Sequence, residues 1–154
     1  MISSSAPTAE IVVASESLDE HFAVRRQVFV EQQALFVGDD RDAWDECAST
    51  VHVVAVVDGA VVGTVRLYPL GSGLWKGDRL AVLPDARVHR LGGELVNFAV
   101  RTAGALGGAR MVAQVQVANV RFFERLGWVR DGDAAVYCGV MHQPMAIALS
   151  AASD

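Results

Sequence analysis

The stretch that decides the fold is Leu80-Ala81-Val82-Leu83-Pro84-Asp85-Ala86-Arg87-Val88-His89-Arg90-Leu91-Gly92-Gly93-Glu94-Leu95. An apolar strand ends at Pro84, and a basic turn that contains Gly92 and Gly93 leads into a helix expected over 92–106. The first N–H groups of a helix have no partner within it, and the helix dipole adds positive potential, so such a turn suits a phosphate. Taken alone, the pattern leaves an ordinary solvated turn equally open.

Strands and helices are expected around this turn in the order β-α-β-β-β-α-β-α-β-β. The clearest local signal is a pair of β-branched runs, Thr50–Val57 and Ala60–Tyr68, joined by Asp58-Gly59 as a hairpin. The other expected strands span 10–14, 74–83, 109–117, 128–130 and 135–149, and the expected helices span 19–33, 92–106 and 119–126. This order predicts one mixed α/β domain with a largely antiparallel sheet.

The composition indicates a single small domain. With 154 residues, of which 52% are hydrophobic, one core is expected over residues 10–150, preceded by a flexible N-terminus at 1–9. The net charge of -5 argues against a nucleic-acid partner. No apolar run is long enough for a membrane span, and no signal peptide is evident, so a soluble cytoplasmic protein is expected. Cys47 and Cys138 form neither a disulfide framework nor a zinc spacing, and no metal is expected.

Two segments carry a resemblance to the GNAT superfamily of N-acetyltransferases. The turn from Arg87 to Gly92 resembles its pyrophosphate loop, Arg/Gln-x-x-Gly-x-Gly/Ala, with Arg90 in place of the middle glycine. Because only glycine adopts the left-handed conformation freely, we expect Arg90 to avoid it. The segment 119–128, Asn-Val-Arg-Phe-Phe-Glu-Arg-Leu-Gly-Trp, is similar to the family's Asn-x-x-Ala-x-x-Phe-Tyr-x-x-x-Gly-Phe. The resemblance implies the GNAT fold, with a mixed, mostly antiparallel sheet of about six to seven strands flanked by helices.

Further segments resemble the branch of GNAT proteins that includes acyl-homoserine-lactone synthases and nitrogen-starvation-associated acetyltransferases. They are residues 25–32, 40–45, 52–55 and 62–67, together with the ending at 139–145, which is similar to Gly-x-Pro-His-x-x-Met with Met141 at the proline position. The strands from Val136 to Leu149 are also rich in apolar residues, and we expect them to pair two subunits in a homodimer.

Opposite charges are spread over the N-terminal half of the chain. Arg25 and Arg26 are on the first helix and Arg66 is on the third strand, whereas the loop 35–48 carries Asp40, Asp42 and Asp45. Bidentate pairing would clamp this loop over an acceptor site. A solvated acidic loop is the alternative, but Phe36 and Trp44 give the loop apolar surface to pack and favour partial burial.

The resemblance implies acetyl-CoA, or another acyl-CoA, as co-substrate and the amine of a small molecule as acceptor. The residues it assigns to the acyl-CoA are Leu80, Ala81, Val82, Arg87, Val88, His89, Arg90, Leu91, Gly92, Gly93, Asn119, Phe122 and Phe123. A backbone N–H near Ala81 or Val82 would polarise the thioester carbonyl. The residues it assigns to the acceptor are Arg26, Phe29, Trp44 and Arg66.

The acid and base of the reaction are less well marked. Phe123 occupies the position at which many relatives have a tyrosine acid, so Tyr137 or Cys138 is the candidate donor, unless the thiolate leaves unaided. Glu31, Asp78 and His142 are the candidate bases, and we take Glu31, Asp78 and Tyr137 as the catalytic set. Two alternatives stay open: an acyl-homoserine-lactone-synthase-like acyltransferase, and a non-catalytic module that binds acyl-CoA.

Overall fold

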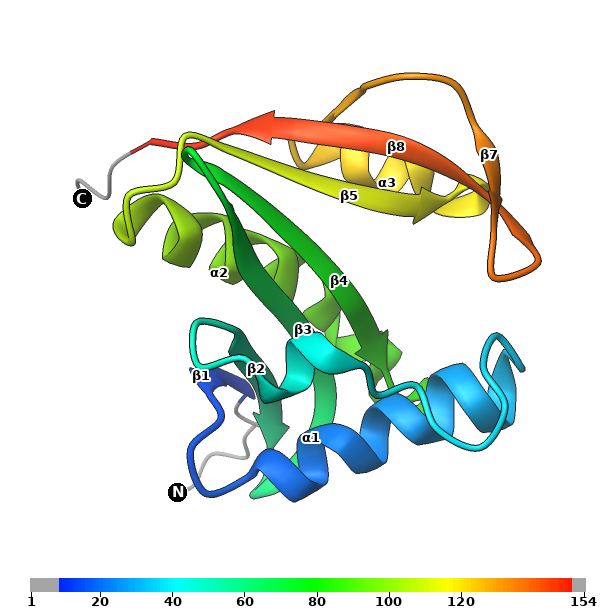
Figure 1. The fold of residues 1–154 in the computed structure, drawn as a ribbon. Coiled ribbons are helices and arrows are strands. Elements are labelled where there is room, and N and C mark those ends of the chain that lie inside the picture. The colour runs from blue at the N-terminus through cyan, green and yellow to red at the C-terminus, as the bar shows by residue number, and fades with distance from the viewer. Residues whose placement is uncertain (1–8, 151–154) are drawn as a thin grey trace, which may run out of the picture.

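One sheet runs through the molecule, and its order is β1-β2-β3-β4-β5-β8-β6, with β7 paired to β8 (Figure 1). The computed structural model describes residues 9–150, except for the side chains of residues 87–89. The strands are β1 Ala9–Val13, β2 Val51–Val57, β3 Ala60–Gly71, β4 Leu74–Val82, β5 Arg110–Gln116, β6 Val129–Arg130, β7 Ala135–Tyr137 and β8 Val140–Ala148. Neighbouring strands are antiparallel, except for the parallel pair β4–β5. The predicted mixed, mostly antiparallel fold is confirmed.

Helices cover the two faces of this sheet. The helical segments are α1 Leu18–Arg25, the π-helix η1 Arg26–Gln32, the 3₁₀ turns η2 Ala43–Glu46, η3 Pro84–His89 and η4 Val117–Asn119, and the helices α2 Leu91–Ala105 and α3 Val120–Arg125. The main core lies between α2 and one face, where Val53, Leu67 and Leu95 are fully buried. A smaller core joins α1 and η1 to the other face through Val28 and Ala81.

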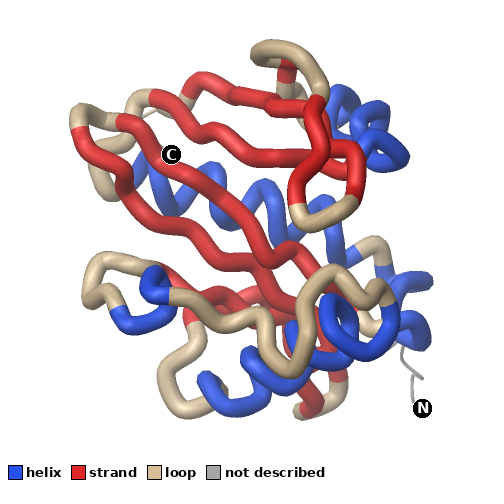
Figure 2. Tube along the Cα trace, turned by 45° about the vertical axis from the view of Figure 1, so that its right-hand side comes forward, coloured by secondary structure: helices blue, strands red, loops and turns tan. Residues whose placement is uncertain are grey.

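The strands β4 and β5 pair only at their first residues. Their register joins Leu74, Trp75 and Lys76 to Arg110, Met111 and Val112 and then ends. Beyond Lys76 the two strands diverge, so that β1–β4 form one arm of the sheet and β5–β8 the other (Figures 1 and 2). The opening between the arms positions the site described below.

Two details of the predicted elements are corrected. The helix expected over 19–33 is α-helical only to Arg25 and then widens into a π-helix. The run 135–149 is a hairpin, because Cys138 (φ 53°) and Gly139 (φ 77°) form a tight turn, and it raises the sheet to eight strands. A cysteine is an unusual residue for a left-handed turn position, so the sequence did not mark this turn. The Asp58-Gly59 hairpin is confirmed.

Several expectations about the whole chain stay predictions. Residues 1–8 lie outside the described part, so the flexible N-terminus is not tested. Val136 and Met141 are exposed on β7 and β8, as pairing between subunits would require, and the homodimer stays a prediction. Within residues 9–150, no helix has the length and apolar character needed to cross a membrane.

Candidate active site

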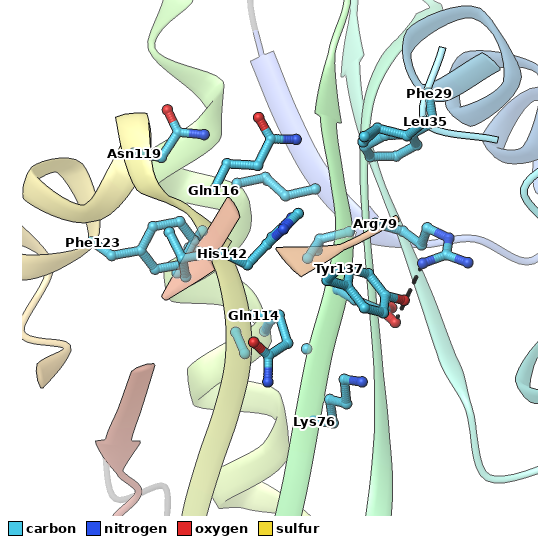
Figure 3. A pocket seen from close by; sticks show the side chains of 18 of the residues that line it. Phe29, Leu35, Lys76, Arg79, Gln114, Gln116, Asn119, Phe123, Tyr137 and His142 are labelled. Carbon is cyan, nitrogen blue, oxygen red and sulfur yellow. Dashed lines mark ion pairs between the residues drawn. The ribbon is translucent and has the colours of Figure 1, made fainter. Parts of the chain in front are cut away.

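A cleft lies between the diverging parts of β4 and β5, and side chains from both arms of the sheet line it (Figure 3). The arm of β4 contributes Lys76, Gly77, Asp78, Arg79 and Leu80, and the opposite arm contributes Gln114, Gln116, Asn119, Phe123, Tyr137 and His142. Phe29 of η1 and Leu35 and Phe36 of the following loop close one side. The π-helix places Phe29 there, a local geometry often found at functional sites.

A β-bulge at Arg79 shapes the β4 wall. Thr64 of β3 pairs with Ala81 and Arg66 pairs with Asp78, so β4 has one more residue between these pairs than β3. Arg79 adopts a left-handed conformation (φ 55°), and the Thr64 hydroxyl donates to its carbonyl oxygen at 2.9 Å. Among the described residues, no strand pairs with β4 beyond Lys76 on its β5 side. The cleft therefore presents a strand edge to which an extended, amide-containing ligand can bind.

The N-terminus of α2 adjoins this strand edge. The basic turn is the 3₁₀ segment η3, and Arg90 follows it at the N-cap of α2 with φ 57° and ψ 35°. The expectation that Arg90 avoids the left-handed region is therefore wrong. This conformation costs about 1–2 kcal/mol for a residue with a side chain, and the surrounding helices hold it. The predicted contacts of the Arg87, Val88 and His89 side chains fall outside the described residues.

The two segments that carried the resemblance meet at this end of α2. A Cβ atom at Gly92 would lie 3.4 Å from Cζ of Phe122, and one at Gly93 would lie 3.7 Å from Cδ2 of Leu126. α3 therefore lies beside the first turn of α2, and both distances are ordinary van der Waals contacts. Phe123 is buried, lines the cleft, and packs edge-on against Trp128 with ring centroids 5.4 Å apart.

A buried network of ion pairs fastens the acidic loop to the sheet. Arg25 donates to Asp40 at 2.7 Å and to both oxygens of Asp45 at 2.7 and 3.0 Å. Arg66 donates to Asp42 at 2.6 and 3.1 Å and to Asp78 at 2.7 Å from each of two nitrogens. The side chains of Arg25, Arg66, Asp40 and Asp45 are fully buried. The predicted pairing with the loop carboxylates is confirmed for Arg25 and Arg66 but not for Arg26, and the burial of Asp40 and Asp45 excludes a solvated loop. That the loop covers an acceptor site stays a prediction.

The same network reaches the bulge. Arg79 donates to Asp40 at 2.9 Å through Nε, and its guanidinium lies 4.7 Å from the ring centroid of Phe36. Trp44 stacks on Tyr68 with ring centroids 4.0 Å apart. The apolar groups of the loop therefore pack as their composition predicts, and the loop, the bulge and the cleft wall form one connected unit.

Burial and pairing shift the pKa values in this network. Burial alone would raise the pKa of Asp45, but hydrogen bonds from His52, Arg25 and the Asp42 backbone outweigh burial and hold the pKa far below its ordinary value. The pKa of Asp42 is also lowered, since its pairing with Arg66 and its attraction to Arg66 and Arg79 exceed the effect of burial. Both carboxylates are thus charged when the loop is in place.

His142 is a titratable group of the cleft that keeps one ring nitrogen free of protein partners among the described residues. Its ring is largely buried and projects between the two arms (Figure 3). Nδ1 lies 2.7 Å from the carbonyl oxygen of Val140, to which only a protonated Nδ1 can donate. In the neutral ring Nε2 then carries a lone pair. Tyr137 packs edge-on against this ring with centroids 5.2 Å apart, so both side chains line the same end of the cleft.

The structure does not bring every predicted site residue to the cleft. Arg26 and Glu31 are exposed on η1 and face each other across 4.0 Å, away from the cleft lining. Asp78 lines the cleft, but Arg66 occupies both of its oxygens, so it serves the network and not as a free base. Neither placement favours Glu31 or Asp78 as the base, and their catalytic role stays a prediction.

The other predicted residues divide between the cleft and its support. Phe29, Leu80, Asn119, Phe123 and Tyr137 line the cleft. Trp44 and Arg66 act behind it, in the acidic loop and the ion-pair network. Ala81 and Leu91 are buried in the two cores, and Val82 packs against the main one.

Arg79, Lys76 and Gln114 are among the cleft residues that the sequence analysis missed. Arg79 required the bulge and the partner Asp40, neither of which a local pattern reveals. Lys76 had an available signal, because it is the one lysine of the chain.

Comparison with known proteins agrees with this architecture. The model of the acetyltransferase (GNAT) family matches residues 16–128. A Bacillus subtilis protein assigned as an acetyltransferase is 26% identical over 132 residues, which cover 85% of this chain and 89% of that protein. An acyl-CoA N-acyltransferase from Pseudomonas aeruginosa superposes with a TM-score of 0.78 at 21% identity, over 92% of this chain and 99% of that one.

A CoA-dependent acyl-homoserine lactone synthase, solved with SAM and isopentyl-CoA, superposes with a TM-score of 0.75 at 20% identity, over 94% of this chain and 84% of that one. Because the family model covers most of the chain, including the strand edge, the α2 turn and α3, the similarity extends beyond the fold. This chain therefore belongs to the acetyltransferase (GNAT) family of acyltransferase enzymes.

Proposed function

We propose that this chain transfers an acetyl or short acyl group from acyl-CoA to the amine of a small-molecule acceptor. The observation that carries the proposal is one cleft that contains both His142 and the edge of β4 from Gly77 to Leu80, with the N-terminus of α2 following β4 through η3. The strand edge suits the pantetheine arm of an acyl-CoA, and the N-terminus of α2 suits its diphosphate. His142 suits the proton transfer that the reaction needs.

The residues present fit a CoA thioester. The backbone of β4 from Gly77 to Leu80 offers N–H and C=O groups to the amides of the pantetheine arm, and the N–H groups of the first turn of α2 offer a site for its diphosphate. Arg90, exposed at the start of α2, adds positive charge there. Bound acyl-CoA supplies the thioester carbon that the amine attacks. A backbone N–H of β4 at the bulge is placed to stabilise the charge that develops on the carbonyl oxygen.

His142 is our candidate for proton transfer. The hydrogen bond of Nδ1 to Val140 leaves Nε2 to accept a proton from the attacking amine. Phe123 cannot donate a proton to the leaving thiolate. The hydroxyl group of Tyr137, which lines the same cleft, is the candidate donor. A thiolate is also a far weaker base than an amide or alkoxide, so it can leave without an acid.

The test combines binding with turnover. We expect acetyl-CoA and CoA to raise the melting temperature of the protein, because both bind the folded state. We expect free thiol to be released from acetyl-CoA in the presence of at least one member of an amine panel, and longer acyl-CoAs in the same screen define the acyl length. Binding without thiol release across the panel would contradict the transfer step and support a non-catalytic acyl-CoA module. The absence of any shift would contradict the site itself.

A further inference from the structure

The single lysine of this chain lies in the cleft. The chain has thirteen lysine and arginine residues, of which only Lys76 is lysine. It occupies the last paired position of β4, opposite Val112, where β4 and β5 begin to diverge. Its side chain is half-buried and lines the closed end of the cleft (Figure 3). No hydrogen bond or ion pair joins it to any residue in the described part of the chain.

The positive charge of Lys76 is not compensated by its acidic neighbour. Asp78, two residues along β4, is held by two nitrogens of Arg66 at 2.7 Å each, and Arg79 Nη1 lies 3.7 Å from it. Both of its oxygens are therefore engaged by arginine nitrogens, and neither pairs with Lys76. Among the residues described, no other acidic side chain lines the cleft. A partly desolvated cation without a partner is unfavourable, so the site favours an anion supplied by a ligand.

Gln114 adds a hydrogen-bond donor beside this cation. It lies on β5 two residues beyond Val112, the partner of Lys76, and it also lines the cleft. Figure 3 shows Gln114 between His142 and Lys76 in this view. Its side-chain amide makes no hydrogen bond within the part of the chain that the structure describes. An ammonium and an amide N–H₂ together match the two oxygens of a carboxylate.

The sheet register sets the distance to the proposed proton acceptor. His142 pairs with Gln116, whereas Lys76 pairs with Val112. Val112 and Gln116, the β5 partners of Lys76 and His142, are four positions apart, which is roughly 13 Å along the strand. The lysine stem and the imidazole each reach across part of this gap. A small molecule with an amine at one end and a carboxylate at the other can bridge what remains.

We propose that the acceptor is an amine that also carries a carboxylate, and that Lys76, assisted by Gln114, binds that carboxylate while the amine faces His142. The proposal rests on the proposed transfer of an acyl group to an amine. It narrows the acceptors to amino-acid-like compounds, and it makes Lys76 a determinant of specificity.

The kinetic test uses matched pairs of acceptors. A series of ω-amino acids of increasing length is compared with the corresponding methyl esters, with acetyl-CoA as donor. We expect the wild type to prefer the acid of the best pair by on the order of 10-fold or more in kcat/KM, as for one charged hydrogen bond. Lys76→Met should abolish this preference by raising KM for the acid while leaving the ester unchanged. Lys76→Arg should retain most of it, and Arg130→Met, which removes an exposed charge, should have no effect.

Two results of this comparison would overturn the proposal: equal use of acids and esters by the wild type, or an equal loss of both in Lys76→Met. Succinyl-CoA with an ester acceptor tests the other source of a carboxylate. If Lys76→Met loses only the use of succinyl-CoA, the carboxylate belongs to the acyl group, and the acceptor proposal fails.

A second measurement does not depend on turnover. Reductive methylation with ¹³C-formaldehyde labels one lysine and the N-terminal amine, so one new NMR signal reports on Lys76. We expect this signal to shift on addition of at least one ω-amino acid of the series and not of its methyl ester. If no amine is acylated, the proposed function fails, yet this signal still decides whether Lys76 binds a carboxylate. A signal that responds to neither compound overturns the inference.

Discussion

The side chain of His142 enters the cleft with one ring nitrogen already engaged by the Val140 carbonyl. This arrangement leaves Nε2 as the free position in the neutral ring. We therefore expect His142→Gln to lower kcat by roughly 10²–10⁴-fold, the usual contribution of a general base. Binding of acetyl-CoA, measured by calorimetric titration, should change little, because the strand edge and the α2 turn are intact.

Tyr137→Phe is the companion variant for His142→Gln. It removes the hydroxyl and keeps the ring that packs on His142. If Tyr137→Phe loses as much kcat as His142→Gln, a proton transfer is assigned to Tyr137. If its kcat is near normal, the thiolate leaves without a proton from Tyr137. If His142→Gln itself has near-normal kcat at pH 7 and an unchanged pH profile, the role proposed for His142 is refuted.

At the level of elements, the acidic loop depends on Arg66 for its attachment to the sheet. This side chain is fully buried and contacts Asp42, Asp45 and Asp78. Arg66→Met leaves these carboxylates without their common partner, and removal of one member of a buried pair typically costs 3–5 kcal/mol. We expect a loss of about that size in the free energy of unfolding, measured by urea denaturation.

An exposed ion pair provides the control for Arg66→Met. Arg110 and Asp131 lie 2.6 Å apart, but both side chains are nearly half exposed. Arg110→Met should therefore change the free energy of unfolding by less than about 1 kcal/mol. Similar losses in the two variants would show that the network around Arg66 contributes no more than a surface pair.

The elements also show where the sequence is informative. The Asp58-Gly59 hairpin follows from β-branched runs and a glycine turn, both of which are local signals. The positive φ of Cys138 and of Arg90 and the π-helix at Phe29 contradict local preference, and no sequence signal marks them. The clamp was predicted as a charge pattern. The choice of Arg25 over Arg26 was not, because it depends on which side of the helix faces the sheet.

The divergence of the two arms is a property of the whole molecule. The strands β4 and β5 lie far apart in the sequence, and their pairing ends where the bulge and the ion-pair network begin to shape β4. No local sequence pattern marks the residue at which the pairing of two parallel strands ends. The resemblance to a family, and not periodicity, was therefore what predicted an acyl-CoA site along β4, and the cleft with Lys76 and His142 across it had to come from the structure.

The stability of the whole fold also depends on a histidine outside the cleft. His21 is fully buried between α1 and β2, where Nδ1 lies 3.1 Å from the Val53 carbonyl oxygen and Nε2 lies 3.3 Å from Arg25 Nη1. Burial, together with the positive charge of Arg25, lowers the pKa of His21 from 6.5 to about 3. The ring is therefore neutral in the folded protein at every pH well above 3.

The pH dependence of unfolding follows from this lowered pKa. Above pH 6.5 the ring is neutral in both states and has no pH-dependent effect. As the pH falls towards 3, His21 is protonated in the unfolded chain but stays neutral in the folded protein. The free energy of unfolding therefore falls by about 1.4 kcal/mol per pH unit. Between pH 6.5 and 4 the loss is roughly 3 kcal/mol, and below pH 4 protonation of Asp42 and Asp45, whose pKa values are lowered in the fold, adds to it.

His21→Asn retains a side-chain N–H that can reach Val53 and cannot titrate in this range. Urea unfolding at pH values from 7 to 4.5 should therefore give a markedly flatter slope for His21→Asn than for the wild type, whatever its stability at pH 7. Parallel slopes would show that another group binds the proton on unfolding.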